Sequence, residues 1–177
     1  MKLFVDLDGV LADFDKEFLI RFGNTPEYFR KCGKVEEKKH WRHFANHILH
    51  GDFYGSLELM PDAMILMDFV KPYSPAILSA TGTQHPQVVA SQKVCWVKHH
   101  FGEIEMHYVK TSADKAGFAT PDSILIDDRE KSINPWVAAG GIGILHKNAA
   151  QTISELKTIL GNRIEEDVSF LKLMAGV

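Results

Sequence analysis

The chain has 177 residues, which is enough for one compact hydrophobic core with a small insertion. Its composition, 45% hydrophobic and 24% charged, is typical of globular domains and excludes disordered and fibrous classes. The net charge of −3 argues against a generally basic nucleic-acid-binding surface. No apolar run is long enough to span a bilayer and no secretory signal is apparent, so we expect a cytoplasmic protein without membrane contact, with Cys32 and Cys95 as reduced thiols.

Short apolar runs bounded by turn residues predict five buried strands: Lys2–Asp6, Pro75–Ser79, Met106–Val109, Ser123–Asp127 and Gly141–Leu145. Amphipathic stretches between them predict helices over residues 62–70, 86–101, 130–139 and 149–160, with Pro86 and Pro135 near helix starts. Strands that alternate with helices indicate the α/β class. We expect a Rossmann-like parallel sheet with helices on both faces, whose strand carboxyl ends meet at one edge.

The connection between the first two expected strands is far longer than one crossover helix requires. It contains the segment Phe14–Phe22, a stretch with Gly23, Asn24 and Pro26, and a predicted helix over Val35–His50. A long insertion beside the functional edge of an α/β sheet is commonly a lid or specificity element; the alternative is a structural insertion. We therefore expect a core domain of residues 1–13 and 61–177 and a small helical cap of residues 14–60. The tail 163–177 has the pattern of an amphipathic helix, which either docks on the core or forms a dimer contact.

Chemically active side chains follow four of the expected strands. Asp6 and Asp8 follow the first and Ser79 the second, Lys110 and Lys115 come after the third, and Asp127 and Asp128 end the fourth. Carboxylates gathered at one edge repel one another unless a cation neutralises them, and Mg²⁺ is the hard, oxygen-preferring cation for that task. The lysines and the Ser79 hydroxyl suit an anionic substrate that carries phosphate.

The first of these segments, Asp6-Leu7-Asp8-Gly9-Val10, has an informative spacing. In an extended strand Asp6 and Asp8 project to the same side, and Gly9 allows a close turn. Two such carboxylates can divide the work, one as nucleophile and one as proton donor. A plain turn is the alternative for an isolated motif, and a calcium loop is excluded because Val10 stands where an oxygen ligand is needed.

These motifs together resemble those of the haloacid dehalogenase-like phosphatases: Asp6–Val10 the first, Ser79 the second, Lys115 the third and Asp127-Asp128 the fourth. A closer resemblance is to the 5′(3′)-deoxyribonucleotidases, carried by DLDGVLADF at 6–14, the Leu-Glu-x-x-Pro within 53–63, KVCWV at 93–97 and ILIDDR at 124–129. The chain departs from that family at Ser79-Ala80-Thr81, where Thr-Ser-Pro is usual, and its cap is shorter.

The resemblance implies a role for each core residue. Asp6 is the expected nucleophile that forms an aspartyl-phosphate, and Asp8 the acid and base. Mg²⁺ is expected on Asp6, the Asp8 carbonyl and Asp128, with Asp127 close by. Three side chains are expected to bind phosphate: Ser79, Lys115 and Lys93, the last of which is otherwise a solvated helix lysine.

In the cap, Phe14, Tyr54 and Trp41 resemble positions where these nucleotidases hold a base against aromatic rings; ordinary core packing is the alternative. The histidines His40, His43, His47 and His50 recur at helical spacing, which fits either a transition-metal chelate or, as we expect, a solvated face.

We therefore expect a Mg²⁺-dependent phosphomonoesterase that acts on deoxynucleoside or nucleoside 5′- or 3′-monophosphates, as a monomer or homodimer. The alternatives are a phosphatase of the same superfamily acting on a sugar or cofactor phosphate, a nucleic-acid 3′-phosphatase, and a non-catalytic phosphate-binding module. The nucleic-acid alternative requires a basic groove. We expect no polymer partner, because the net charge is negative and we expect no Arg/Lys cluster. Retention of both Asp6 and Asp8 argues against the non-catalytic module, since a binder needs no proton donor.

Overall fold

The computed structural model describes residues 1–161, so the predicted tail helix at 163–177 lies outside the described residues. Five parallel strands form one sheet in the order β3-β2-β1-β4-β5. Their bounds are β1 Lys2–Val5, β2 Ala76–Ala80, β3 Met106–Val109, β4 Ser123–Asp127 and β5 Ile142–Leu145. The predicted α/β class and parallel sheet are confirmed, and each predicted strand lies within a residue of an observed one.

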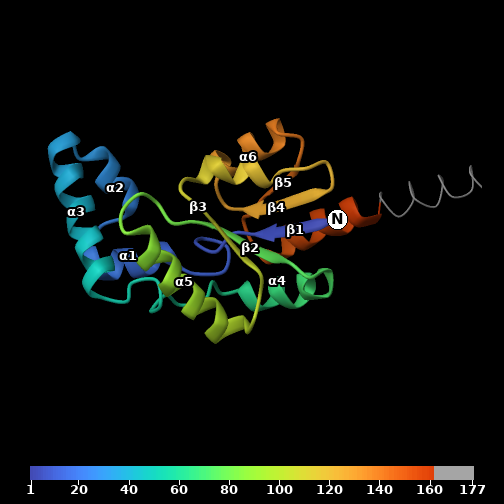
Figure 1. Cartoon of the computed structure of the whole chain (residues 1–177), viewed down its shortest axis with the longest axis horizontal. Helices are drawn as coiled ribbons and strands as arrows, with labels where there is room; N and C mark the ends of the chain where they lie inside the picture. The colour runs from blue at the N-terminus through green and yellow to red at the C-terminus, as the bar shows by residue number, and fades with distance from the viewer. Residues whose placement is uncertain (162–177) are drawn as a thin grey trace, which may run out of the picture.

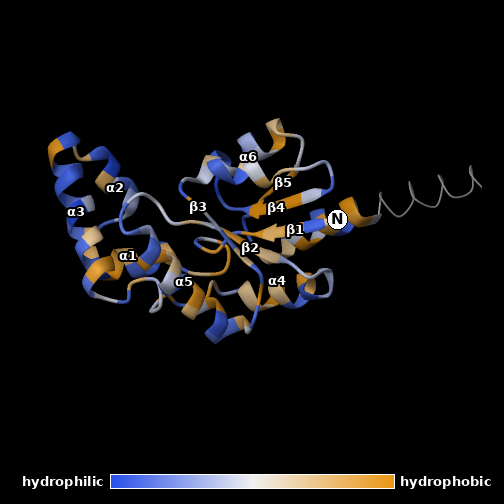
Figure 2. Ribbon diagram, viewed as in Figure 1, coloured by the Kyte–Doolittle hydropathy of each residue, from blue (hydrophilic) through white to orange (hydrophobic). Residues whose placement is uncertain are grey.

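Side chains alternate between the two faces of the sheet, as period-2 geometry requires. In β1, Val5 packs into the core on one face, where α4 (Ala63–Val70), α5 (Pro86–Phe101) and the helix over residues 149–161 lie. Phe4 packs on the opposite face with Trp136 of α6 (Glu130–Ala138) and Phe118, the last residue of the 3₁₀ helix η2 (Ser112–Phe118). Helices therefore cover both faces, with α4 and α5 on one side and α6 on the other (Figure 1). The strands themselves are predominantly hydrophobic (Figure 2).

Three helices follow β1 and lie together beyond the carboxyl ends of the strands: α1 Phe14–Phe22, α2 Pro26–Lys31 and α3 Lys34–His50 (Figure 1). Buried Phe18 packs against the rings of Phe14, Phe22, Phe29 and Phe44 at centroid distances of 4.7–5.6 Å, which gives these helices an aromatic core of their own. The division into a core domain and a cap of residues 14–60 stays a prediction.

The sequence analysis missed α2. Thr25 caps this helix by accepting a hydrogen bond from the Tyr28 N–H at 3.2 Å, and Pro26 occupies its first position. The Thr-Pro-Glu start was therefore a usable signal. The expectation for Pro135 was wrong: it lies inside α6 rather than near its start, and so removes one hydrogen bond to the carbonyl of Lys131.

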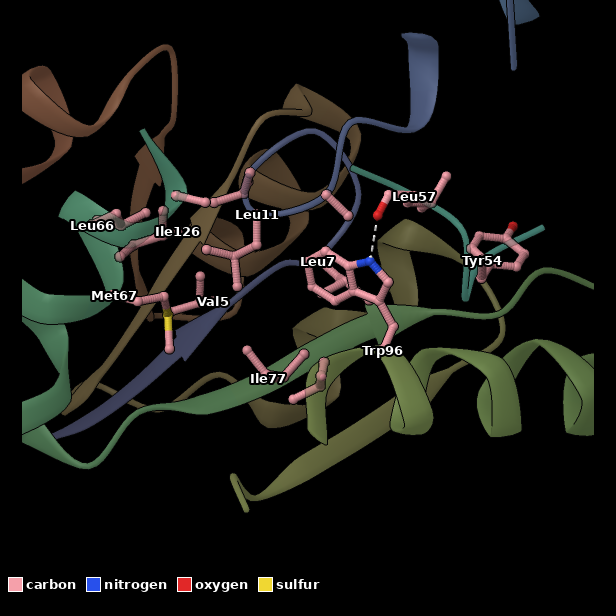
Figure 3. Packing of buried hydrophobic residues seen from close by; sticks show 14 of the residues in the cluster. Val5, Leu7, Leu11, Tyr54, Leu57, Leu66, Met67, Ile77, Trp96 and Ile126 are labelled. Atoms are coloured by element: carbon pink, nitrogen blue, oxygen red, sulfur yellow. Dashed lines mark hydrogen bonds between the residues drawn. The ribbon is translucent and has the colours of Figure 1, made fainter. Parts of the chain in front are cut away.

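The segment that returns from α3 to the sheet is fixed from two sides. The Trp96 indole N–H of α5 donates to the Leu57 carbonyl at 2.7 Å, within the core cluster that also holds Leu7, Leu11 and Tyr54 (Figure 3). The Gln92 side chain, one turn earlier, accepts from the Tyr54 backbone N–H at 3.1 Å and donates to the carbonyls of Ile48 and Gly51 at 3.1 and 2.9 Å. Helix α5 thereby sets where Tyr54 lies. Within residues 1–161, no helix combines the length and apolar character needed to cross a membrane.

Candidate active site

Asp6 and Asp8 lie at the carboxyl end of β1, where the chain leaves the sheet in a tight turn. The Leu7 carbonyl accepts hydrogen bonds from the backbone N–H groups of Leu11 and Ala12 at 2.9 Å, which closes the turn. Gly9 has a φ of +81°, and a Cβ at this position would stand 2.5 Å from the Asp128 carboxylate. Only glycine fits this conformation and this approach, so the motif brings Asp128 against the first turn.

Lys93 of α5 is fully buried behind this turn. Its ammonium donates to Asp8 Oδ2 at 2.7 Å, to Ser79 Oγ at 2.8 Å and to the Ala80 carbonyl at 3.0 Å. The solvated-lysine alternative is therefore wrong. Because its three donors all have protein acceptors, Lys93 positions Asp8 and Ser79 relative to each other. The same ammonium lies 4.7 Å from the centroid of the Tyr54 ring, in a cation–π contact.

Lys115 of η2 contacts Asp6 and Asp127, as Lys93 contacts Asp8. It is 1% exposed, and its ammonium lies 2.7 Å from Asp6 Oδ1 and 2.5 Å from Asp127 Oδ2. Burial acts against the charged ammonium, but the attraction of Asp6 and Asp127 outweighs burial and raises the pKa of Lys115. Lys115 therefore stays charged and fixes the orientation of the Asp6 carboxylate.

Three carboxylates converge beside these lysines. Oxygen atoms of Asp6, Asp127 and Asp128 lie within 4.8 Å of one another. Burial, followed by the repulsion of Asp6, raises the pKa of Asp127 to about 6, and burial with the repulsion of Asp6 and Asp127 raises the pKa of Asp128 to about 7. Asp128 forms no ion pair with a lysine within residues 1–161. The cluster thus carries more negative charge than its neighbours compensate, and hard oxygen ligands of this kind fit Mg²⁺.

Asp8 differs from these groups in its surroundings. Burial raises its pKa, Lys93 opposes that shift, and the charge of Asp6 adds to it. Its Oδ2 atom is held by Lys93, while Oδ1 is buried without a hydrogen-bond partner among the described residues. A carboxyl group whose pKa is raised and that has one free oxygen is suited to give a proton to a substrate atom.

A cavity of about 490 Å³ joins Asp6 and Asp8 to the aromatic residues of the predicted cap. Phe14, Trp41, Phe44 and Tyr54 line it from that side, and residues 80–84 and 110–112 line it from the sheet edge. The Phe14 and Tyr54 rings are 6.0 Å apart at an angle of 37°, which is ordinary aromatic contact. A base therefore has no room between these two rings, and they form one wall of the cavity.

The structure brings the predicted core residues together as expected. Ser79 and Lys93 are fully buried, and Lys93 contacts both Asp8 and Ser79. Phe14, Trp41 and Tyr54 each pack on neighbouring rings and also border the cavity. His40 stacks on Phe29 at 4.3 Å, whereas His43 and His47 lie 4.8 Å apart and both pack edge-on against Phe22. Within residues 1–161 no metal-binding group includes a histidine.

Sequence reasoning missed Arg30, and for Arg129 it left open whether the side chain orients the acidic pair or only lies at a helix start. Both line the cavity, Arg30 from α2 and Arg129 from the segment after β4. Burial, with the like charge of Arg129 next, lowers the pKa of Arg30, and its guanidinium lies 5.8 Å from the Trp41 ring. Recognising α2 from its capping residues would have placed Arg30 beside the site.

Comparison with known proteins agrees with this architecture. A family model described as 5′ nucleotidase, deoxy (pyrimidine), cytosolic type C protein matches residues 1–157. No curated protein matches the chain. The structure resembles the L-2-haloacid dehalogenase PA0810 with a TM-score of 0.51 and 14% identity, over 80% of this chain and 82% of that one. It also resembles a hydrolase from Pseudomonas syringae with a TM-score of 0.50 and 12% identity, over the same shares of the two chains. At such identities the two structures indicate the fold alone.

Proposed function

The chain belongs to the cytosolic type C family of deoxy (pyrimidine) 5′ nucleotidases and is a haloacid dehalogenase-like phosphatase, and on that premise we propose that it hydrolyses nucleoside monophosphates, deoxynucleotides foremost. The observation that carries this proposal is that one continuous cavity runs from Asp6 and Asp8 to an aromatic wall of Phe14 and Tyr54. A sugar phosphate has no flat surface for that wall, whereas a nucleobase gains stacking energy there.

In the proposed reaction, one carboxylate oxygen of Asp6 attacks the phosphorus and the bond from phosphorus to the nucleoside oxygen breaks. Asp8 gives its proton to the leaving oxygen, then accepts a proton from the water that hydrolyses the aspartyl-phosphate. This second step releases inorganic phosphate and restores both carboxyl groups. Lys115 holds Asp6 in line, since it fixes one of its two oxygens.

Mg²⁺ fits the acidic cluster, and Asp6, Asp128 and the Asp8 carbonyl, with Asp127 beside them, would hold it. When bound it would neutralise charge on the phosphoryl group and on the carboxylates. Ser79, kept in place by Lys93, would donate its hydroxyl proton to a phosphoryl oxygen. We further propose that residues 14–60 act as a cap whose helices shield the reaction from water.

The test is kcat/KM for deoxynucleoside 5′- and 3′-monophosphates, ribonucleotides, a sugar phosphate and a generic aryl phosphate. Deoxynucleotides are expected to be the best substrates, and Asp6→Asn to abolish turnover of all of them because an amide cannot attack phosphorus. Tyr54→Ala should weaken nucleotides by about 1–3 kcal/mol and leave the sugar phosphate nearly unchanged, because the sugar phosphate has no flat ring to stack on this wall.

Tyr73→Ala is the matched control, because Tyr73 is an exposed tyrosine on η1 (Lys71–Tyr73), outside the cavity lining. Equal losses on every substrate in Tyr54→Ala would make Tyr54 a structural residue. A sugar phosphate as the best substrate would replace the nucleotidase proposal with the alternative phosphatase.

A further inference from the structure

A second groove, of about 1110 Å³, adjoins the cavity along helix α3. Its lining includes four basic residues and one acidic residue: Lys34, Lys38, Lys39 and Arg42, and Glu37. Val35, Trp41 and Gln84 complete the lining. Trp41 and Gln84 border both the groove and the cavity. The groove is thus a continuation of the active-site cavity past its aromatic side.

The charge of this region is opposite to that of the whole chain. Residues 30–42 contain six lysines and arginines against two glutamates, whereas the chain has a net charge of −3. Helix α3 is accordingly hydrophilic along most of its length (Figure 2). The expectation that the chain lacks an Arg/Lys cluster is therefore wrong, because six basic residues stand within 13 consecutive positions on α2 and α3.

The basic side chains of the groove are available to a ligand. Lys34, Lys38 and Arg42 follow one another at four-residue spacing, so they share one face of α3. Within the described part of the chain none of the three forms an ion pair, and Lys39 has only a 4.0 Å contact with Glu36. Like charges on one helix face repel each other, and an anion in the groove would relieve that repulsion.

An aromatic ring beside such a row of cations is the combination that binds phosphate-linked nucleotides. The cations follow the backbone phosphates and the ring offers a stacking surface that every base can use. Trp41 lies where the groove begins, with the Arg30 guanidinium 5.8 Å from its ring. A substrate whose terminal phosphate lies at Asp6 can therefore extend past Trp41 toward the lysines.

We propose that this basic groove binds a second phosphate group of the substrate, one that is not cleaved. The proposal rests on the proposed nucleotidase activity and extends it to substrates longer than a mononucleotide. The second phosphate belongs either to a deoxynucleoside 3′,5′-bisphosphate or to the phosphodiester of a 5′-phosphorylated dinucleotide. The reaction at the terminal phosphate is unchanged: Asp6 attacks, the alcohol leaves with a proton from Asp8, and water releases inorganic phosphate.

The experiment compares kcat/KM for a deoxynucleoside 5′-monophosphate, the 3′,5′-bisphosphate and the 5′-phosphorylated dinucleotide. It uses the wild type, Lys34→Gln/Lys38→Gln and the control Lys98→Gln/Lys157→Gln, whose lysines are exposed outside both cavities. At least one extended substrate should exceed the monophosphate by about fivefold or more in the wild type and control, and lose that advantage in Lys34→Gln/Lys38→Gln. The slope of log kcat/KM against log salt for that substrate should flatten by about 0.7, the value for one neutralised phosphate of a single strand.

A binding measurement separates this inference from the proposed function. The dissociation constants of the three compounds are measured with Asp6→Asn, with and without Lys34→Gln/Lys38→Gln, where turnover plays no part. Tighter binding of an extended compound that depends on the two lysines supports the groove even if no nucleotide is hydrolysed. Equal affinity for all three compounds, or an advantage that survives the substitutions, overturns it.

Discussion

Replacing Asp128 with asparagine tests the acidic cluster without any assay of activity. Burial and the charges of Asp6 and Asp127 raise the pKa of Asp128 from 3.8 to about 7. This shift is larger than that of Asp127, whose pKa is raised to about 6. A carboxyl whose pKa is higher in the folded state than in the unfolded state destabilises the fold when it ionises. This penalty grows as the pH rises from 3.8 to about 7 and is constant above. Asp128→Asn removes it.

The shift corresponds to roughly 4 kcal/mol at 1.36 kcal/mol per pKa unit. Because Asp128 is exposed on one side, solvent screening reduces this value, and we expect a gain of about 1–2 kcal/mol at pH 8 in the presence of a chelator. For a chain of this size that gain corresponds to a rise of about 2–8 °C in Tm. The gain should shrink when the pH is lowered from 8 to 5, because wild-type Asp128 then becomes protonated in the folded state.

The assay is thermal unfolding of both proteins at pH 5 and pH 8, in chelator and in excess Mg²⁺. Mg²⁺ should stabilise the wild type more at pH 8 than at pH 5, since it competes with protons for the carboxylates, and should stabilise Asp128→Asn much less. Asp68→Asn is the control, because Asp68 is exposed on α4, outside the cluster. A lower Tm for Asp128→Asn at pH 8 in chelator, or an undiminished response to Mg²⁺, would refute the electrostatic account.

Three further substitutions test the supports of the site. Lys93→Met removes the cation that lowers the pKa of Asp8, so the limb of the pH profile of kcat/KM assigned to Asp8 should move to higher pH. The substitution should also reduce kcat about 10²–10⁴-fold. A pH profile that does not move would contradict this role of Lys93. Gln92→Leu leaves the Ile48 and Gly51 carbonyls without a side-chain donor and should cost about 1–3 kcal/mol in denaturant unfolding. It should also raise KM for nucleotides more than for an aryl phosphate, whereas exposed Gln87→Leu should do neither. Gly9→Ala places a Cβ 2.5 Å from Asp128 and should lower kcat at least about tenfold, whereas Gly117→Ala, with open space around it, should be neutral.

The sequence by itself determined the class of fold and which acidic side chains gather at the sheet edge. Buried parallel strands are short apolar runs, so their pattern predicted all five strands and the helices that follow β2 and β4, but not α2. Asp6, Asp8, Ser79, Asp127 and Asp128 follow directly from that pattern, because residues at the carboxyl ends of parallel strands meet in space wherever they stand in the chain.

Tertiary structure alone decided what lies around those carboxylates. Lys93 reads as one of several lysines on an amphipathic helix, and only the packing of α5 on the sheet buries it between Asp8 and Ser79. The Phe14 and Tyr54 rings could either hold a base between them or form one wall of the cavity. The outcome depends on how α1 packs against the segment after α3 that contains Tyr54. The basic groove likewise arises because α3 lies beside Gln84. Such contacts join residues distant in sequence through side-chain packing, and local hydrophobic periodicity carries no information about them.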